Sequence, residues 1–267
     1  MPPALTFLGH STVRISLAGR TVLTDPVLTG RVGPLRRVVP PPAAWSWAGV
    51  DLVLVSHLHG DHLHLPSLRL LGRGTHVVVP RGAGAWLRGK GFTRVSELAP
   101  GEVLVDGDLT VTGTTAVHSG HRWGPRSTHG PDAVALGHLL TGDGSTVYAA
   151  GDTDVFPGMT GLGPVDVALL PVWGWGMTLG PGHMDPAGAA LACSLLRPRA
   201  AVPVHWGTLA LPGLARTRRM RTLLVEPPRR FAADVAAAGL PTRVLVTQPG
   251  HAVPLGTVRG NCPPGTP

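Results

Sequence analysis

The sequence predicts a layered α/β protein in which helices cover two β-sheets. Short apolar runs recur along the chain, and helical patterns fall between them in both halves. Strands that alternate with helices in this way are typical of sheets with helices packed on their outer faces. Glycine and proline, 37 and 28 of the 267 residues, mark frequent turns and argue against a helix bundle.

The predicted strands follow the apolar runs. The first three alternate partly between polar and apolar residues, which indicates a meander with one solvated face. The runs LVLV, VALL and AVPV are nearly all apolar, as expected of strands buried on both faces. The expected strands are Ala4–Leu8, Thr12–Leu17, Thr21–Leu23, Leu52–Val55, His76–Val79, Leu109–Val117, Ala133–Leu140, Thr146–Ala150, Val167–Leu170, Ala201–Val204 and Arg243–Val246.

Four helices are predicted, at Leu65–Leu71, Ala83–Lys90, Pro186–Leu196 and Phe231–Ala238. The third is the clearest, because Asp185 is a good N-cap and Pro186 suits the first helical position. Residues 30–49 form a Pro/Arg/Trp-rich connection of the kind that borders sites. The chain is expected to form one domain over residues 1–256, with a flexible tail over 257–267.

The composition narrows the classes of partner that the chain is expected to bind. The formal net charge is +8, but Lys90 is the only lysine among 23 basic residues, which suggests GC-rich coding more than a nucleic-acid partner. No apolar run approaches the roughly 18 residues of a membrane span, although peripheral membrane contact stays open. The start of the chain lacks a secretory signal, so a cytoplasmic location is expected. Cys193 and Cys262 match no metal-binding spacing, and the oligomeric state is open.

A cluster of polar residues follows the predicted strand LVLV. Four polar residues lie within six positions of the segment SHLHGDHL, namely His57, His59, Asp61 and His62. Packing alone does not explain so many polar groups at a strand end. In a tight loop, His57 and His59 can bind one ion while Asp61 and His62 bind another. Imidazole with carboxylate suits Zn²⁺ first, with Mn²⁺ or Fe²⁺ as alternatives, against the reading of a surface cluster without an ion.

Further ligands are expected from other strand ends. His118, Asp152 and His205 are each the first or second polar side chain after an apolar run. Singly, each is more easily explained as a structural residue. With the HxHxDH segment they complete the set that a two-metal site requires.

The sequence resembles the metallo-β-lactamase superfamily over about residues 4–250. The motifs appear in order: the aspartate of LTDPVL, then HxHxDH, and then the three strand-end residues. The resemblance implies a four-layer αββα sandwich with two divalent ions at one edge between the sheets. It implies that His57, His59 and His118 hold the first ion, that Asp61, His62 and His205 hold the second, and that Asp152 bridges them. Asp25 would orient ligands from the outer shell, although from the residues alone it is equally a turn aspartate before Pro26.

Shorter motifs point to a branch of the superfamily. FLGHS, AAGDTD, GHMDP and PVHWGT resemble the group that contains ascorbate-6-phosphate lactonases and N-acyl phosphatidylethanolamine phospholipase D. In the phospholipase-like pattern a tryptophan directly follows the third histidine. Here Ser119 stands at that position and Trp123 comes four residues later, so this part of the resemblance is incomplete.

The expected function is hydrolysis by a hydroxide that bridges two ions, held by Asp61 and facing Asp152. The expected substrate is a small or lipid-like molecule, anionic or an ester, cleaved at a phosphodiester or a lactone or other ester bond. His183, just before a helix N-terminus, is expected to bind a substrate anion or to protonate the leaving group. The alternative for His183 is a turn histidine satisfied by backbone.

Other interpretations remain open at this stage. A metal-binding sensor or scaffold without turnover has no need of both ions, and iron-dependent oxidoreductases of this kind usually carry an acidic residue where His59 stands. Trp173 and Trp175, with three other tryptophans, could wall a hydrophobic cleft or be ordinary packing. The arginine run over residues 216–221 faces either an anionic partner or solvent.

Overall fold

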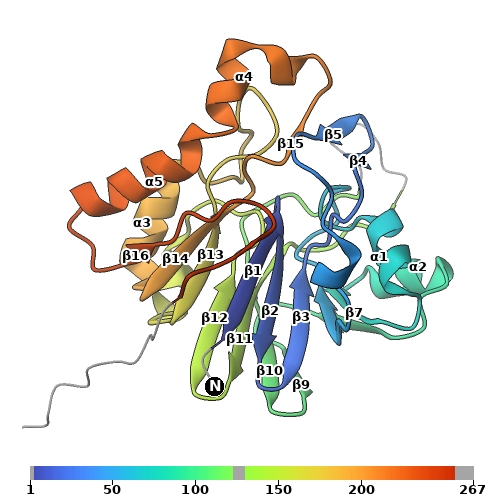
Figure 1. Cartoon of the computed structure of the whole chain (residues 1–267). Coiled ribbons are helices and arrows are strands. Elements are labelled where there is room, and N and C mark those ends of the chain that lie inside the picture. The colour runs from blue at the N-terminus through green and yellow to red at the C-terminus, as the bar shows by residue number, and fades with distance from the viewer. Residues whose placement is uncertain (1–2, 123–129, 256–267) are drawn as a thin grey trace, which may run out of the picture.

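The computed structural model describes residues 3–122 and 130–255. Within this part of the chain, two seven-stranded sheets form the centre of the fold, with helices outside them (Figure 1). The expected tail over 257–267 and the indole of Trp123 lie outside the described residues. The expectation of one domain over residues 1–256 stays a prediction.

The first sheet has the strand order β17-β1-β2-β3-β6-β7-β8. Its first three strands form the predicted antiparallel meander, and β3, β6, β7 and β8 then run parallel. The strands are β1 (Ala4–Gly9), β2 (Thr12–Leu17), β3 (Arg20–Thr24), β6 (Leu52–Leu54), β7 (His76–Pro80), β8 (Val95–Leu98) and β17 (His251–Ala252).

The second sheet has the strand order β16-β14-β13-β12-β11-β10-β9. From β9 to β12 the neighbours are antiparallel, and β12, β13, β14 and β16 run parallel. The strands are β9 (Val103–Asp106), β10 (Leu109–Thr115), β11 (Leu136–Gly142), β12 (Ser145–Ala149), β13 (Val167–Pro171), β14 (Ala200–Val204) and β16 (Arg243–Val244).

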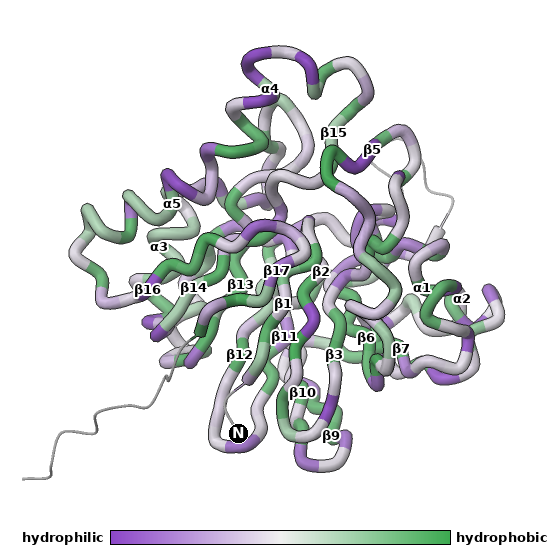
Figure 2. Tube along the Cα trace, in the orientation of Figure 1, coloured by the Kyte–Doolittle hydropathy of each residue, from purple (hydrophilic) through white to green (hydrophobic). Residues whose placement is uncertain are grey.

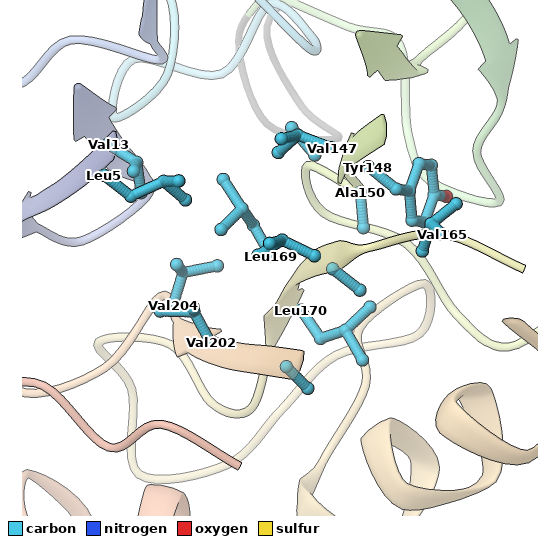
Figure 3. Packing of buried hydrophobic residues seen from close by; sticks show 14 of the residues in the cluster. Leu5, Val13, Val147, Tyr148, Ala150, Val165, Leu169, Leu170, Val202 and Val204 are labelled. Carbon is cyan, nitrogen blue, oxygen red and sulfur yellow. The ribbon is translucent and has the colours of Figure 1, made fainter. Parts of the chain in front are cut away.

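The core lies between the two sheets and continues under the helices. Leu5 and Val13 of the first sheet belong to one buried cluster with Leu169 and Val202 of the second (Figure 3). The same cluster includes residues of α3 (Pro186–Leu196) and α5 (Glu226–Ala237). A second cluster joins the outer face of β6 and β7 to α1 (Leu65–Leu71) and α2 (Gly84–Gly89). The four-layer αββα sandwich is therefore confirmed.

The connection at residues 30–49 contains more structure than the sequence suggested. β4 (Arg31–Val32) and β5 (Leu35–Arg37) form a hairpin that pairs with β15 (Leu209–Ala210), and η1 (Ala44–Ser46) follows. Val32 and Leu35 are buried against Leu209 in a small separate cluster. Strands this short, paired with a segment far along the chain, leave no periodic signal in the sequence.

Two predictions near the C-terminal end were incomplete. α5 begins at Glu226 rather than at Phe231, because its prolines stand in the first turn, where missing N–H groups cost nothing. The arginine run is not a loop throughout: it spans η3 (Leu214–Arg216) and α4 (Arg218–Leu223). Figure 2 shows hydrophilic residues along α4 and hydrophobic ones along the central strands. η2 (Pro157–Gly161) completes the described helices.

The topology brings many strand ends to one edge. β3 and β6 are parallel, so their carboxyl ends lie on the same side of the first sheet. In the second sheet β10, β12, β13 and β14 run in one direction, because β11 is antiparallel to both β10 and β12. The loops after these strands carry the polar residues singled out above. Among the described residues, no helix has the length and apolar character needed to cross a membrane.

Candidate metal centre

The HxHxDH segment forms a tight turn after β6. The backbone N–H groups of His62 and Leu63 both donate to the His59 carbonyl, at 3.0 and 2.9 Å. The turn directs His57 and His59 toward one place, and Asp61 and His62 toward another. That the two sets hold separate ions stays a prediction, since His57 and His62 also lie together around Asp152.

The first ligand group consists of His57, His59 and His118. His59 Nδ1 lies 3.0 Å from His57 Nε2 and 3.1 Å from His118 Nε2. His57 is fully buried and the other two are half-buried. His118 comes from the loop after β10, so the group joins the two sheets.

The second ligand group consists of Asp61, His62 and His205. His62 Nε2 and His205 Nε2 are 3.2 Å apart, and Asp61 Oδ2 lies 3.9 and 3.8 Å from them. All three side chains are buried. His205 follows β14 and has a φ of 63°, a strained left-handed conformation that turns its ring back over the sheet edge.

Asp152 stands between the two groups. Its Oδ2 lies 3.2 Å from both His62 Nε2 and His205 Nε2, and 3.9 Å from His57 Nε2. Its Oδ1 is buried and has no hydrogen-bond partner among the described residues. A buried carboxylate oxygen without a partner is costly, which favours a cation at this position.

Whether the two groups fit metal ions depends on which ring nitrogen of each histidine carries the proton. His118 Nδ1 donates to the Gly182 carbonyl and His205 Nδ1 to the Trp173 carbonyl, each at 2.7 Å. Carbonyls only accept, so both Nδ1 atoms carry a proton. Burial lowers the pKa of His118 to about 4, so its ring is neutral near pH 7 and directs the Nε2 lone pair inward. Lone pairs that converge within about 3 Å repel unless a cation or a proton lies between them. The residues therefore fit metal binding by imidazole and carboxylate.

Asp25 accepts hydrogen bonds from residues of the HxHxDH segment and from the serine before it. Its carboxylate accepts from the Ser56 backbone N–H and hydroxyl, each at 2.7 Å, and from His62 Nδ1 at 2.9 Å. These bonds fix the orientation of His62 and leave its Nε2 facing Asp152. The position matches the role of an orienting residue that the resemblance implied, rather than a turn aspartate alone.

Two supporting residues were only partly visible in the sequence. Asp61 Oδ2 accepts from His10 Nε2 at 3.0 Å and from the indole N–H of Trp175 at 3.1 Å. Burial and the nearby His205 lower the pKa of His10 to about 4, so this ring is neutral near pH 7. Its one proton is on the nitrogen that donates to Asp61, so His10 orients this carboxylate, and its ring also lies in the group of His10, Asp61, His62 and His205 that could hold an ion. The sequence marks His10 only through the FLGHS motif.

The tryptophans within the described residues do not line one common cleft. Trp175 lines the cavity beside the ligand groups, whereas Trp45 is 77% exposed and Trp173 packs against the main core. The cavity holds about 660 Å³ and lies between the ligand groups, the β4–β5 hairpin and the loop over residues 174–180. The expectation that residues 30–49 border a site agrees with this, through Val32 and Leu35.

His183 lies at the inner wall of the same cavity. Its Nε2 is 3.5 Å from Asp152 Oδ2, and its Nδ1 contacts the Gly180 carbonyl at 3.1 Å. Burial lowers the pKa of this ring, but the carboxylate of Asp152 outweighs burial and raises it above the ordinary value of 6.5. The ring is therefore neither sealed in the core nor turned to bulk solvent, and it faces the space next to both ligand groups.

Metal uptake is expected to release a proton from His62. Burial lowers the pKa of His62, but the carboxylates of Asp152 and Asp25 raise it well above 6.5. Without metal the ring is protonated near pH 7, and this contribution to stability is lost as pH rises through the raised pKa. A metal ion needs the lone pair, so the proton must leave. Zinc titrations of metal-free protein in buffers of different ionisation enthalpy should show release of about one proton; enthalpies identical in all buffers would contradict this.

The chain is similar to known proteins in both sequence and structure. The family described as "Beta-lactamase superfamily domain" matches residues 20–206. A UPF0173 metal-dependent hydrolase of Nitratidesulfovibrio vulgaris is 31% identical over 274 residues, covering 98% of this chain and 99% of the relative. The structure of Igni18, described as a novel metallo hydrolase from Ignicoccus hospitalis, is 27% identical with a TM-score of 0.72, covering 94% of this chain and 98% of that one.

A third similarity concerns the fold alone. CmlA, a diiron β-hydroxylase from Streptomyces venezuelae, has a TM-score of 0.66 at 20% identity, and the match covers 92% of this chain and 53% of that one. The same fold thus occurs in a protein with oxidative iron chemistry. The fold by itself does not choose between hydrolysis and oxidation, and the site must decide.

Proposed function

The chain belongs to the β-lactamase superfamily, within which it is a metal-dependent hydrolase, and we propose that it uses two divalent ions to cleave an ester bond. The observation that carries the proposal is Asp152, which lies between two histidine-rich ligand groups with one buried oxygen unpartnered. In this proposal His57, His59 and His118 hold one ion, Asp61, His62 and His205 the other, and Asp152 both. Zn²⁺ is the first candidate.

Two divalent ions held by these residues would lower the pKa of a bound water to about 7 and would polarise the oxygen of the bond to be cleaved. The residues of the chain do the rest. His10 and Trp175 both donate to the carboxylate of Asp61. Burial raises the pKa of Asp61, but the hydrogen bond from His10 and the nearby histidines outweigh burial and hold the pKa well below its usual range. Asp61 is thus an ionised acceptor that orients the attacking water. The rest of the cavity lining is mostly apolar or glycine.

We assign His183 the proton transfer to the leaving oxygen. Its Nε2 faces Asp152 and the cavity, within reach of a group held between the two ligand groups. The same nitrogen could instead hold a substrate anion. The motifs FLGHS, AAGDTD, GHMDP and PVHWGT support a substrate of the lactonase and phospholipase-like group, which means a lactone or a phosphodiester.

Replacing His183 should matter most when the leaving group is poor. An alkoxide needs a proton as it departs, whereas p-nitrophenolate does not. His183→Ala should lower kcat about 100-fold on a methyl or alkyl ester and much less on the matching p-nitrophenyl ester. The metal content should stay as in the wild type. Equal losses on both esters would show that His183 binds the substrate rather than donating a proton.

The test of the proposed function begins with the metal content. Untagged protein purified without chelator should contain about two zinc or manganese ions per chain by elemental mass spectrometry. The loaded protein should then hydrolyse bis(p-nitrophenyl) phosphate or a γ- or δ-lactone. Iron with oxygen-dependent turnover would favour the oxidoreductase, and two ions without turnover on any ester would favour a sensor or scaffold. Protein that stays metal-free after reconstitution would overturn the proposal.

A further inference from the structure

His64 is a buried histidine at the cavity that the ligand groups do not use. It precedes α1, is 6% exposed and lines the cavity together with Arg122. Its sequence position alone is typical of a structural histidine. Its place two residues after His62 puts it beside the metal centre but outside both ligand groups.

The proton of His64 can be located from its neighbours. The backbone N–H of Leu28 donates to Ser67 Oγ at 2.7 Å, and Ser67 Oγ lies 2.7 Å from His64 Nδ1. The hydroxyl proton of Ser67 has no other acceptor among the described residues, so it is donated to His64 Nδ1. The single ring proton is therefore on Nε2.

This Nε2–H is available to the cavity. It makes no hydrogen bond within residues 3–122 and 130–255, and it is not among the sealed polar atoms of the core. Arg122, whose Nη1 donates to the Leu58 carbonyl at 2.7 Å, adds a positive charge to the same lining. Burial lowers the pKa of Arg122 only to about 10, so the charge is present at neutral pH.

The described lining gives this part of the cavity a donor character. Outside the ligand groups and His183, its ionisable side chains are His64 and Arg122, and its only carboxylates are Asp61 and Asp152. Most of the remaining lining is apolar or glycine. A buried N–H beside a cation is satisfied best by an anionic oxygen.

We propose that His64 and Arg122 form a second recognition point, which holds an anionic oxygen group of the substrate away from the bond that is cleaved. This rests on the proposed function, since one end of the substrate must lie at the metal centre. The substrate class is thus an organic ester or lactone with an apolar body and a separate acidic group. His64 Nε2 acts as a specificity-determining donor.

The test uses pairs of phosphonates with the metal-loaded protein. Alkylphosphonates place an anion at the metal centre, and ω-phosphonoalkanoic acids of the same chain lengths add a distant carboxylate. Isothermal titration over a series of chain lengths should find one length at which the carboxylate strengthens binding about tenfold. His64→Asn keeps an acceptor for Ser67 but loses the distant N–H, and it should lose this gain while binding alkylphosphonate like the wild type.

Three comparisons separate the outcomes. His64→Gln, whose amide N–H₂ reaches the position of Nε2, should recover part of the gain. His76→Asn, at another histidine bonded to a serine, should behave like the wild type. If alkylphosphonates bind but no chain length gains from the carboxylate, or if His64→Asn keeps the gain, the second recognition point is overturned. If alkylphosphonates bind to neither loaded nor metal-free protein, the proposed function fails instead.

Discussion

Removing the metal ions is expected to abolish ester hydrolysis and to lower the Tm by about 10 °C or more. Binding at a ligand concentration 1,000-fold above Kd stabilises a folded protein by about 4 kcal/mol. For a chain of this size each kcal/mol corresponds to about 2–4 °C in Tm. The convergence of His57, His59 and His118 within 3.0–3.1 Å adds to the effect, because their lone pairs lose the cation between them.

The size of the Tm difference should depend on pH. Without metal, the raised pKa of His62 lets a proton replace part of the missing charge. This stabilisation is complete below the ordinary pKa of 6.5 and is lost as pH rises through the raised value. The gap between loaded and metal-free protein should therefore widen from pH 6 to pH 8. Calorimetry of chelator-treated protein, with and without added zinc, measures it; unchanged Tm and turnover after complete removal would contradict the two-metal site.

The ligand groups were predictable because their signals are local. HxHxDH follows an apolar strand, and His118, Asp152 and His205 each end another. In a parallel arrangement such strand ends meet at one edge, so their sequence positions already suggest proximity. The resemblance to a known superfamily then implied which ion each residue would hold, with Asp152 shared by both. The short strands β8 and β9 were missed, because they carry too little periodicity to be recognised.

What the sequence could not provide were contacts between distant segments. His10 and Asp61 are 51 residues apart, and Trp175 is 114 residues from Asp61. The donor role of His64 depends on a chain of two hydrogen bonds that begins at the Leu28 backbone. Such roles follow from the direction of single side chains and from the tautomers that their partners impose, and residue type alone determines neither.

Replacing Asp61 should be among the most damaging single substitutions. Asp61→Asn preserves the size of the side chain but removes the charge that faces His62 and His205. The amide of the asparagine has two possible orientations. In one, its N–H₂ faces the donors His10 and Trp175; in the other, its oxygen faces these donors and its N–H₂ faces the second ligand group. We expect kcat to fall about 1,000-fold, which is the middle of the range for a group that handles the attacking water. The second ion should bind more weakly, as elemental analysis after dialysis would show.

A matched pair of tryptophan variants tests why Asp61 works. Trp175→Phe keeps the ring in the cavity wall but removes the N–H that donates to Asp61 Oδ2, leaving only His10 on that oxygen. The loss of one orienting bond should lower metal affinity or turnover about tenfold. Trp45→Phe changes the same residue type at a side chain that is 77% exposed, and it should leave both unchanged.

Full turnover of Asp61→Asn with two ions still bound would remove Asp61 from the mechanism, because the carboxylate charge would then serve neither the ion nor the water.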